Sequence, residues 1–209
     1  MRYLGVRSDP AGEVREKLER LAASLRQRIR PRHVLRVLDI RRTANGLWLD
    51  SVSLPGDMAR VMLADCAQAA LLVCTLGPGF DALMRQQQAR GMAEAVLLDA
   101  LGSAMVEEGC DAAEAELSGR CPGLHLTDRF SPGYGDLPLS IQPDILAATD
   151  ATRRLGVTAL PSCLMNPQKT VTAVVGLADK PQQARIRGCG HCALRERCAY
   201  RKGGTTCAY

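Results

Sequence analysis

Apolar residues recur at steps of three and four between residues 13 and 29, which predicts an amphipathic helix at the start of the chain. Residues 33–42 are rich in Val, Leu and Ile and are typical of a strand. Asn45-Gly46 is a hairpin turn signal, and residues 47–49 supply the returning partner strand. The first quarter of the chain is therefore expected to form a helix followed by a β-hairpin.

The middle of the chain alternates between helical and extended patterns. A short helix is expected over residues 57–67, and the continuous apolar run of 69–75 predicts a buried strand. The Ala-, Leu- and Met-rich stretch 80–117 predicts one or two helices with a break near Gly91. Residues 118–138 are dense in Gly and Pro and predict a long loop, and such loops inside compact domains are often functional.

After this loop, the hydrophobic pattern again predicts both helices and strands. Residues 144–155 read as a helix, and Gly156 is a suitable C-terminal cap. Residues 158–165 and 170–177 are expected to be strands. The apolar pattern stops soon after the second of them. The prediction is an α+β domain over residues 1–180 and a tail over 181–209.

Composition supports a separate tail and excludes several classes of function. The net charge is +5, and the stretch 180–209 holds seven Lys and Arg against one acidic residue, so the positive surplus lies there. Aromatic residues make up 3%, which disfavours single-stranded nucleic-acid binding by stacking. No apolar run approaches the ~18 residues of a membrane span, and the start has no signal-peptide pattern. We expect a cytoplasmic protein whose nine cysteines do not form disulfides.

The tail cysteines have a spacing typical of metal ligands. They are Cys189, Cys192, Cys198 and Cys207. Two residues separate the first pair, so both sulfurs can point at one metal. A [4Fe–4S] cluster and a zinc ion are both held by four cysteines, and the spacing leaves that choice open, with redox-active thiols as a third interpretation. The remaining cysteines lie in or beside apolar segments and are expected to be buried free thiols: Cys66, Cys74, Cys110, Cys121 and Cys163.

The loop segment 129–138 combines a constrained backbone with chemically capable side chains. It contains two prolines and two glycines, together with Arg129, Tyr134 and Asp136. A guanidinium forks onto a carboxylate, and a tyrosine ring faces a cation or an adenine. Chemistry alone leaves a ligand-binding loop and a structural loop pinned by an Arg–carboxylate pair as alternatives. No nucleophile, phosphate loop or dinucleotide fingerprint is present, so no catalytic side chain is assigned.

The motif at 129–134, Arg-x-Ser-Pro-Gly-Tyr, resembles the Arg-x-x-x-Gly-Tyr signature of the activation domain of cobalamin-dependent methionine synthase. The segment 155–171 is similar to the part of that family that leads into its next strand. The family loop usually continues Tyr-Pro-Ala-Cys-Pro, whereas residues 135–138 here read Gly-Asp-Leu-Pro. Several stand-alone relatives look similar in carrying a cysteine tail, which favours iron–sulfur over zinc.

The resemblance implies a fold and a set of ligand contacts. The fold is α+β, with a curved, mainly antiparallel sheet flanked by helices and a small cysteine-ligated tail. The ligand is S-adenosylmethionine, bound in a cleft that faces the corrin. Arg129 would hold its methionine carboxylate, and Ser131 and Gly133 would supply backbone contacts. Tyr134 would lie beside the sulfonium, and Glu107 would take the ribose or amine, with a solvated surface carboxylate as the alternative for Glu107.

The implied function is reductive reactivation of cobalamin on a separate corrinoid protein or cobalamin-dependent methyltransferase. S-adenosylmethionine would give the methyl group, and a flavodoxin or ferredoxin would give the electron. The chain has no evident corrinoid-binding module and would act as an accessory in trans. Three alternatives stay open: a corrinoid-protein reductase or chaperone without S-adenosylmethionine binding, a zinc-tailed nucleic-acid-binding protein, and a structural partner of a methyltransferase complex.

Overall fold

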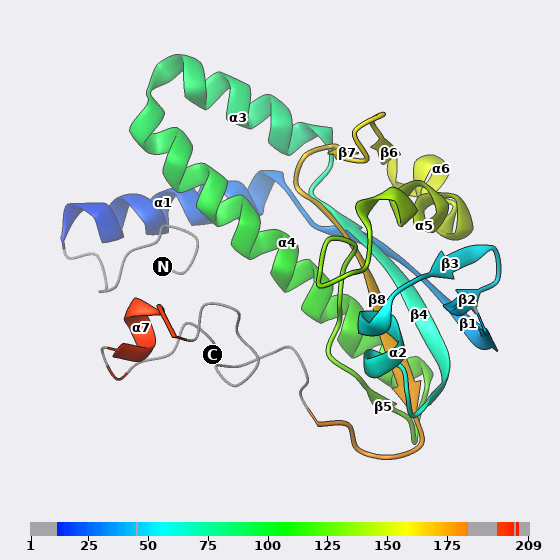
Figure 1. Ribbon diagram of the computed structural model, residues 1–209. Coiled ribbons are helices and arrows are strands. Elements are labelled where there is room, and N and C mark those ends of the chain that lie inside the picture. Colours follow the sequence, from blue (N-terminus) through cyan, green and yellow to red (C-terminus); the bar gives the residue numbers. More distant parts are fainter. Residues whose placement is uncertain (1–11, 45, 184–195, 203, 205–209) are drawn as a thin grey trace.

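The computed structural model describes residues 12–44, 46–183, 196–202 and 204. Six strands form one antiparallel sheet in the order β3–β2–β1–β4–β8–β5 (Figure 1). Their bounds are β1 Arg32–Thr43, β2 Gly46–Leu49, β3 Val52–Leu54, β4 Cys66–Thr75, β5 His125–Leu126 and β8 Thr170–Ala178. A two-stranded sheet pairs β6 Thr158–Ala159 with β7 Met165–Asn166.

Helices cover both faces of the large sheet. Their bounds are α1 Glu13–Arg28, α2 Asp57–Met62, α3 Pro78–Arg90, α4 Met92–Arg120, α5 Gln142–Thr149 and α6 Ala151–Leu155, with a 3-10 turn over Leu139–Ile141. The short helix α7 Ala199–Lys202 belongs to the tail. The long helix α4 lies on one face, with α1 and α3 packed against it, and α2, α5 and α6 lie on the other face (Figure 1). The arrangement is three layers deep, with the sheet in the middle.

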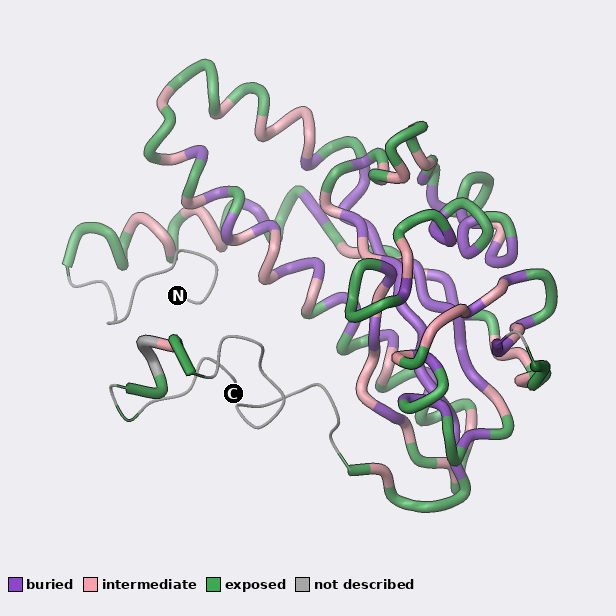
Figure 2. The backbone as a smooth tube through the Cα atoms, viewed as in Figure 1, coloured by how far each residue is buried: buried purple, intermediate pink, exposed green. Residues whose placement is uncertain are grey.

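Helices on both faces of the sheet explain why the sequence of β4 is a continuous apolar run. Leu71 and Val73 pack into the cluster under α5 and α6, whereas Leu72 and Cys74 pack into the cluster under α4. Because successive strand side chains point to opposite faces, a strand buried on both sides carries no polar alternation. Figure 2 shows this buried centre in purple along β4 and β8.

Most of the predicted elements are confirmed, and the fold class is the expected one. The helix α1, the hairpin β1–β2, the strands β4 and β8, the break at Gly91 and the αL cap at Gly156 (φ 73°) all occur as predicted. The expected helix over 57–67 ends at Met62, because Cys66 already begins β4.

Two element predictions are wrong in their extent. The helix expected over 144–155 is divided at Asp150, which adopts the left-handed conformation with φ 54°. The strand expected over 158–165 is a short hairpin instead, because Leu160 N–H donates to the Leu164 carbonyl at 2.8 Å and turns the chain back.

The cysteine predictions fall partly on described residues. Cys66, Cys74 and Cys110 are buried free thiols as expected, whereas Cys121 and Cys163 are free but partly exposed. Of the tail ligands, Cys198 is described and half-buried, and Cys189, Cys192 and Cys207 lie outside the described residues. No helix among the described ranges is long and apolar enough to cross a membrane.

Candidate functional site

Backbone hydrogen bonds on both sides of Arg129 fix its position beside the edge of β8. Thr127 N–H donates to the Gly176 carbonyl at 3.0 Å, and Phe130 exchanges two bonds with Val174 at 3.0 and 2.8 Å. Phe130 is fully buried in the core on the α5 side. Its neighbour Arg129 points to the opposite face, toward α4, as strand alternation requires.

A tight turn follows Arg129 and holds the remaining predicted loop residues. Tyr134 N–H donates to the Ser131 carbonyl at 3.0 Å, and Gly133 N–H donates to the Leu137 carbonyl at 2.7 Å. Gly133 and Gly135 have φ of 94° and 55°, a region that side chains rarely adopt. The Tyr134 side chain is 51% exposed, and its hydroxyl makes no hydrogen bond to the residues that the structure describes.

Asp136 joins this turn to the start of α2. Its carboxylate accepts the N–H groups of Asp57 at 2.6 Å and Met58 at 2.9 Å, as an N-terminal cap does. These bonds, the one from Met58 first, hold the pKa of Asp136 below its usual value. A side chain at Gly56 would lie 2.5 Å from the Asp136 carboxylate. Asp136, at which the sequence departs from the family loop, therefore makes a structural contact that orients the turn.

The Arg129 guanidinium contacts three carboxylates of α4. Nη2 donates to Glu107, and Nη1 donates to Asp111 and Glu114, each at 2.6 Å. These acids lie four and three residues apart on one helical face. The Arg129 side chain is 11% exposed. Burial opposes its charge, but the bonds to Glu114, Asp111 and Glu107 outweigh burial and raise the Arg129 pKa.

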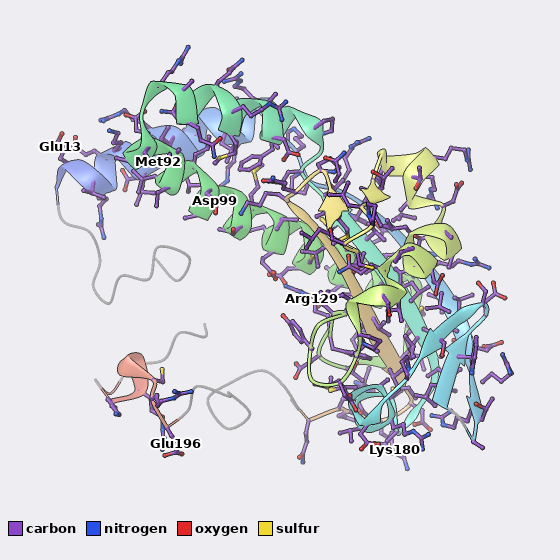
Figure 3. All side chains as sticks on the ribbon, turned by 45° about the horizontal axis from the view of Figure 1, so that its top comes forward. Glu13, Met92, Asp99, Arg129, Lys180 and Glu196 are labelled. Atoms are coloured by element: carbon purple, nitrogen blue, oxygen red, sulfur yellow. The ribbon has the colours of Figure 1, made fainter. Side chains whose placement is uncertain are left out.

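A second cation lies on the same face of α4. Lys169 Nζ is 2.9 Å from Asp99 Oδ1 and donates to Ser103 Oγ at 2.8 Å, with its side chain 19% exposed. We call Asp99, Ser103, Glu107, Asp111 and Glu114 the α4 stripe. Figure 3 labels Asp99 and Arg129 toward the two ends of this row along α4. Among the described residues, four carboxylates and the two cations Arg129 and Lys169 meet along the stripe.

The structure joins some of the predicted site residues and leaves others apart. Arg129 and Glu107 are in direct contact, so Glu107 is not merely a solvated surface carboxylate, and the loop is pinned by an Arg–carboxylate network. Ser131, Gly133 and Tyr134 form the adjoining turn.

Sequence reasoning missed several members of the α4 stripe. Asp111 and Glu114 were detectable, because they continue the helical spacing of Glu107. Lys169 carried no such signal, since its partners Asp99 and Ser103 lie far away in sequence.

A cleft of about 210 Å³ lies elsewhere, between α1, α3 and α4. Four leucines and five polar or charged residues line it: Leu21, Leu25, Leu83 and Leu98, and Ser24, Arg28, Gln86, Gln87 and Arg90. None of the loop or stripe residues lines it. The candidate site is therefore an exposed polar surface beside the loop and not this cleft.

Sheet order, helical cover on both faces and the loop beside α4 define the class: an α+β domain with the fold of a methionine synthase activation domain. The chain is similar to the crystal structure of "the MetH Reactivation Domain bound to AdoHcy", with a TM-score of 0.60 and 13% identity over 94% of this chain and 76% of that chain. No family model and no curated protein sequence matches the chain. The likeness confirms the fold that the motif predicted.

Proposed function

We propose that the chain binds S-adenosylmethionine beside the junction of the α4 stripe and the 129–138 loop, and uses it to reactivate a corrinoid on a separate protein. The observation that carries this proposal is the contact between Arg129 and Glu107 next to the Gly133–Tyr134 turn. It occurs in a fold whose MetH counterpart was crystallised with AdoHcy, the product of methyl transfer from S-adenosylmethionine.

The charge of the stripe suits a cationic ligand. S-adenosylmethionine carries a sulfonium and an ammonium, and Glu107 and Asp111 are 40% and 65% exposed, so their carboxylates are within reach of a ligand. The exposed ring of Tyr134 offers a face to a sulfonium. The role of Arg129 as the anchor of the methionine carboxylate stays a prediction, and three of the five N–H donors of its guanidinium already contact Asp111, Glu114 and Glu107.

The chemistry needs no side-chain nucleophile. One electron from a flavodoxin- or ferredoxin-type donor reduces the partner's inactive Co(II) corrinoid to Co(I). Co(I) attacks the methyl carbon of S-adenosylmethionine, and the C–S bond breaks. S-adenosylhomocysteine leaves with the electron pair of that bond, and the corrinoid becomes methyl-Co(III). This chain supplies the position of the methyl donor and a suitable electrostatic surface, and the corrinoid supplies the reactivity.

The four-cysteine tail belongs to the same proposal as a [4Fe–4S] site. Its support is the donor set itself, since four thiolates within residues 189–207 suit a cluster or zinc. Anaerobic purification tests the assignment. A brown protein with broad visible absorption and with iron and acid-labile sulfide supports the cluster, and a colourless protein that contains zinc contradicts it.

Calorimetric titration with S-adenosylmethionine tests the ligand assignment. Glu107→Gln removes a carboxylate that contacts Arg129, and we expect it to weaken binding about tenfold, the scale of one charged hydrogen bond. Glu108→Gln is the matched control, because Glu108 is the neighbouring acid on α4 and pairs with Arg26. We expect the control to bind as the wild type does.

A second function is favoured by one observation. Three protein carboxylates already contact Arg129, so the residue is stabilised without any ligand. A chain that no longer binds S-adenosylmethionine could keep the same contacts around Arg129. Such a chain would be a corrinoid-protein reductase or chaperone. Co(II) reduction on a partner without methyl transfer, together with no calorimetric signal for S-adenosylmethionine, would identify that function.

A further inference from the structure

We propose that Lys169 is the residue that binds the carboxylate of the ligand at the α4 stripe. This inference rests on the proposed function, and it gives the carboxylate contact to Lys169 in place of Arg129, the residue that the resemblance implied. Lys169 precedes β8 and lies beside Ser103, one helical turn from Glu107 on α4.

The backbone around Lys169 is held on several sides. The Lys169 carbonyl accepts the N–H of Leu76 at 3.0 Å, at the end of β4. The preceding residue, Gln168, donates its N–H to Asp81 of α3 at 3.1 Å. Both contacts fix the point from which the lysine side chain crosses to α4, so its ammonium is positioned before any ligand arrives.

The ammonium of Lys169 has binding capacity left. It carries three donors, and the described contacts with Asp99 and Ser103 account for two of them. Asp99 is 54% exposed, which places this end of the stripe next to solvent. A ligand carboxylate can accept the third donor without displacing a protein group.

The charge along α4 favours one orientation of an amino-acid ligand. The Lys169 end is neutral, because one cation faces the single carboxylate of Asp99. The Arg129 guanidinium is already in contact with three carboxylates, so a further carboxylate bound there would lie beside groups of the same charge. Residues four apart on a helix are separated by about 6 Å along its axis. A zwitterionic amino-acid moiety therefore lies with its carboxylate at Lys169 and its ammonium at Glu107.

The test compares S-adenosylmethionine with its decarboxylated analogue, S-adenosyl-3-methylthiopropylamine, by calorimetry on the full chain. Lys169→Met is expected to weaken binding of S-adenosylmethionine about tenfold or more, the scale of one charged hydrogen bond. Binding of the decarboxylated analogue is expected to stay within about twofold, because that ligand has no carboxylate to lose. Lys17→Met is the matched control, since Lys17 also pairs with an acid of α4, Glu94 at 2.6 Å, away from the stripe.

A second variant keeps the test decisive if Lys169→Met is poorly folded. Asp99→Asn leaves Lys169 in place and removes its competing charge, so it is expected to tighten binding of S-adenosylmethionine severalfold and not to tighten binding of the analogue, which has no carboxylate. Thermal melts confirm that each variant is folded.

The outcomes separate this inference from the proposed function. Equal weakening of both ligands by Lys169→Met, or no weakening of either, overturns the assignment of Lys169 and leaves the proposed function standing. A wild-type chain that binds neither ligand overturns both. Selective loss of S-adenosylmethionine supports both.

Discussion

Replacing Arg129 by methionine removes the cation on which Glu107, Asp111 and Glu114 converge. Methionine keeps most of the apolar volume of the side chain, so the change tests charge more than packing. The three carboxylates would then lose the cation that they share, and the 129–138 loop would lose its ion pairs with α4.

The exposure of the partners sets the size of the effect. Breaking a buried ion pair costs about 3–5 kcal/mol, and an exposed pair is worth about 0–1 kcal/mol. Arg129 and Glu114 are 11% and 17% exposed, but Asp111 is 65% exposed and partly screened by water. We therefore expect Arg129→Met to lower the free energy of unfolding by about 2–3 kcal/mol, between the two limits.

Urea unfolding followed by circular dichroism at neutral pH measures this loss. Arg129→Met/Glu114→Gln is expected to recover about 1 kcal/mol, because it also removes the least exposed of the three carboxylates that Arg129 contacts. Arg26→Met is the control, since Arg26 and Glu108 form an ion pair on the same helix with side chains 63% and 57% exposed. A change of less than about 0.5 kcal/mol for Arg129→Met, equal to the control, would refute the reasoning.

Three further variants test the packing and the cap. Gly102→Ala places a methyl 2.2 Å from the buried ring of Phe80 and is expected to lower the free energy of unfolding by about 1–3 kcal/mol. Gly119→Ala on the same helix enters open space and is expected to raise the free energy of unfolding by up to about 1 kcal/mol. Urea unfolding that ranks the two variants the other way would contradict the packing of Gly102 against Phe80. Asp136→Asn tests the sign of a pH effect. The folded-state pKa of Asp136 is depressed by the N–H groups of Met58 and Asp57, so its contribution to stability is present above its unfolded pKa and is lost as pH falls through the folded value. The melting-temperature gap between wild type and Asp136→Asn is expected to be wide at pH ~7 and to narrow below pH ~4, and a constant gap contradicts the cap.

Local sequence patterns were sufficient to predict the elements in which buried residues recur at a regular spacing. The 3.6-residue period of α1, the apolar run of β4 and the turn signal at Gly46 each correspond to one physical preference, and each element appears in the structure. Asp150 shows the limit of this reasoning, because its left-handed conformation divides a pattern that reads as one helix.

Only part of the candidate site could be predicted from the sequence, and the reason is a different one. Arg129 and Glu107 were singled out separately, but the network that joins them depends on α4 lying against the edge of β8. Lys169 and Asp99 are farther apart still, and although Lys169 lies in the segment 155–171 of the resemblance, nothing in that segment points to Asp99. Contacts between distant segments follow from the packing of helices on the sheet, which residue spacing within one segment does not encode.

The most direct measurement of the central claim is calorimetric titration of the full chain with S-adenosylmethionine. We predict saturable binding that Glu107→Gln weakens about tenfold and that Glu108→Gln leaves unchanged. A folded wild-type chain that gives no binding signal would contradict it.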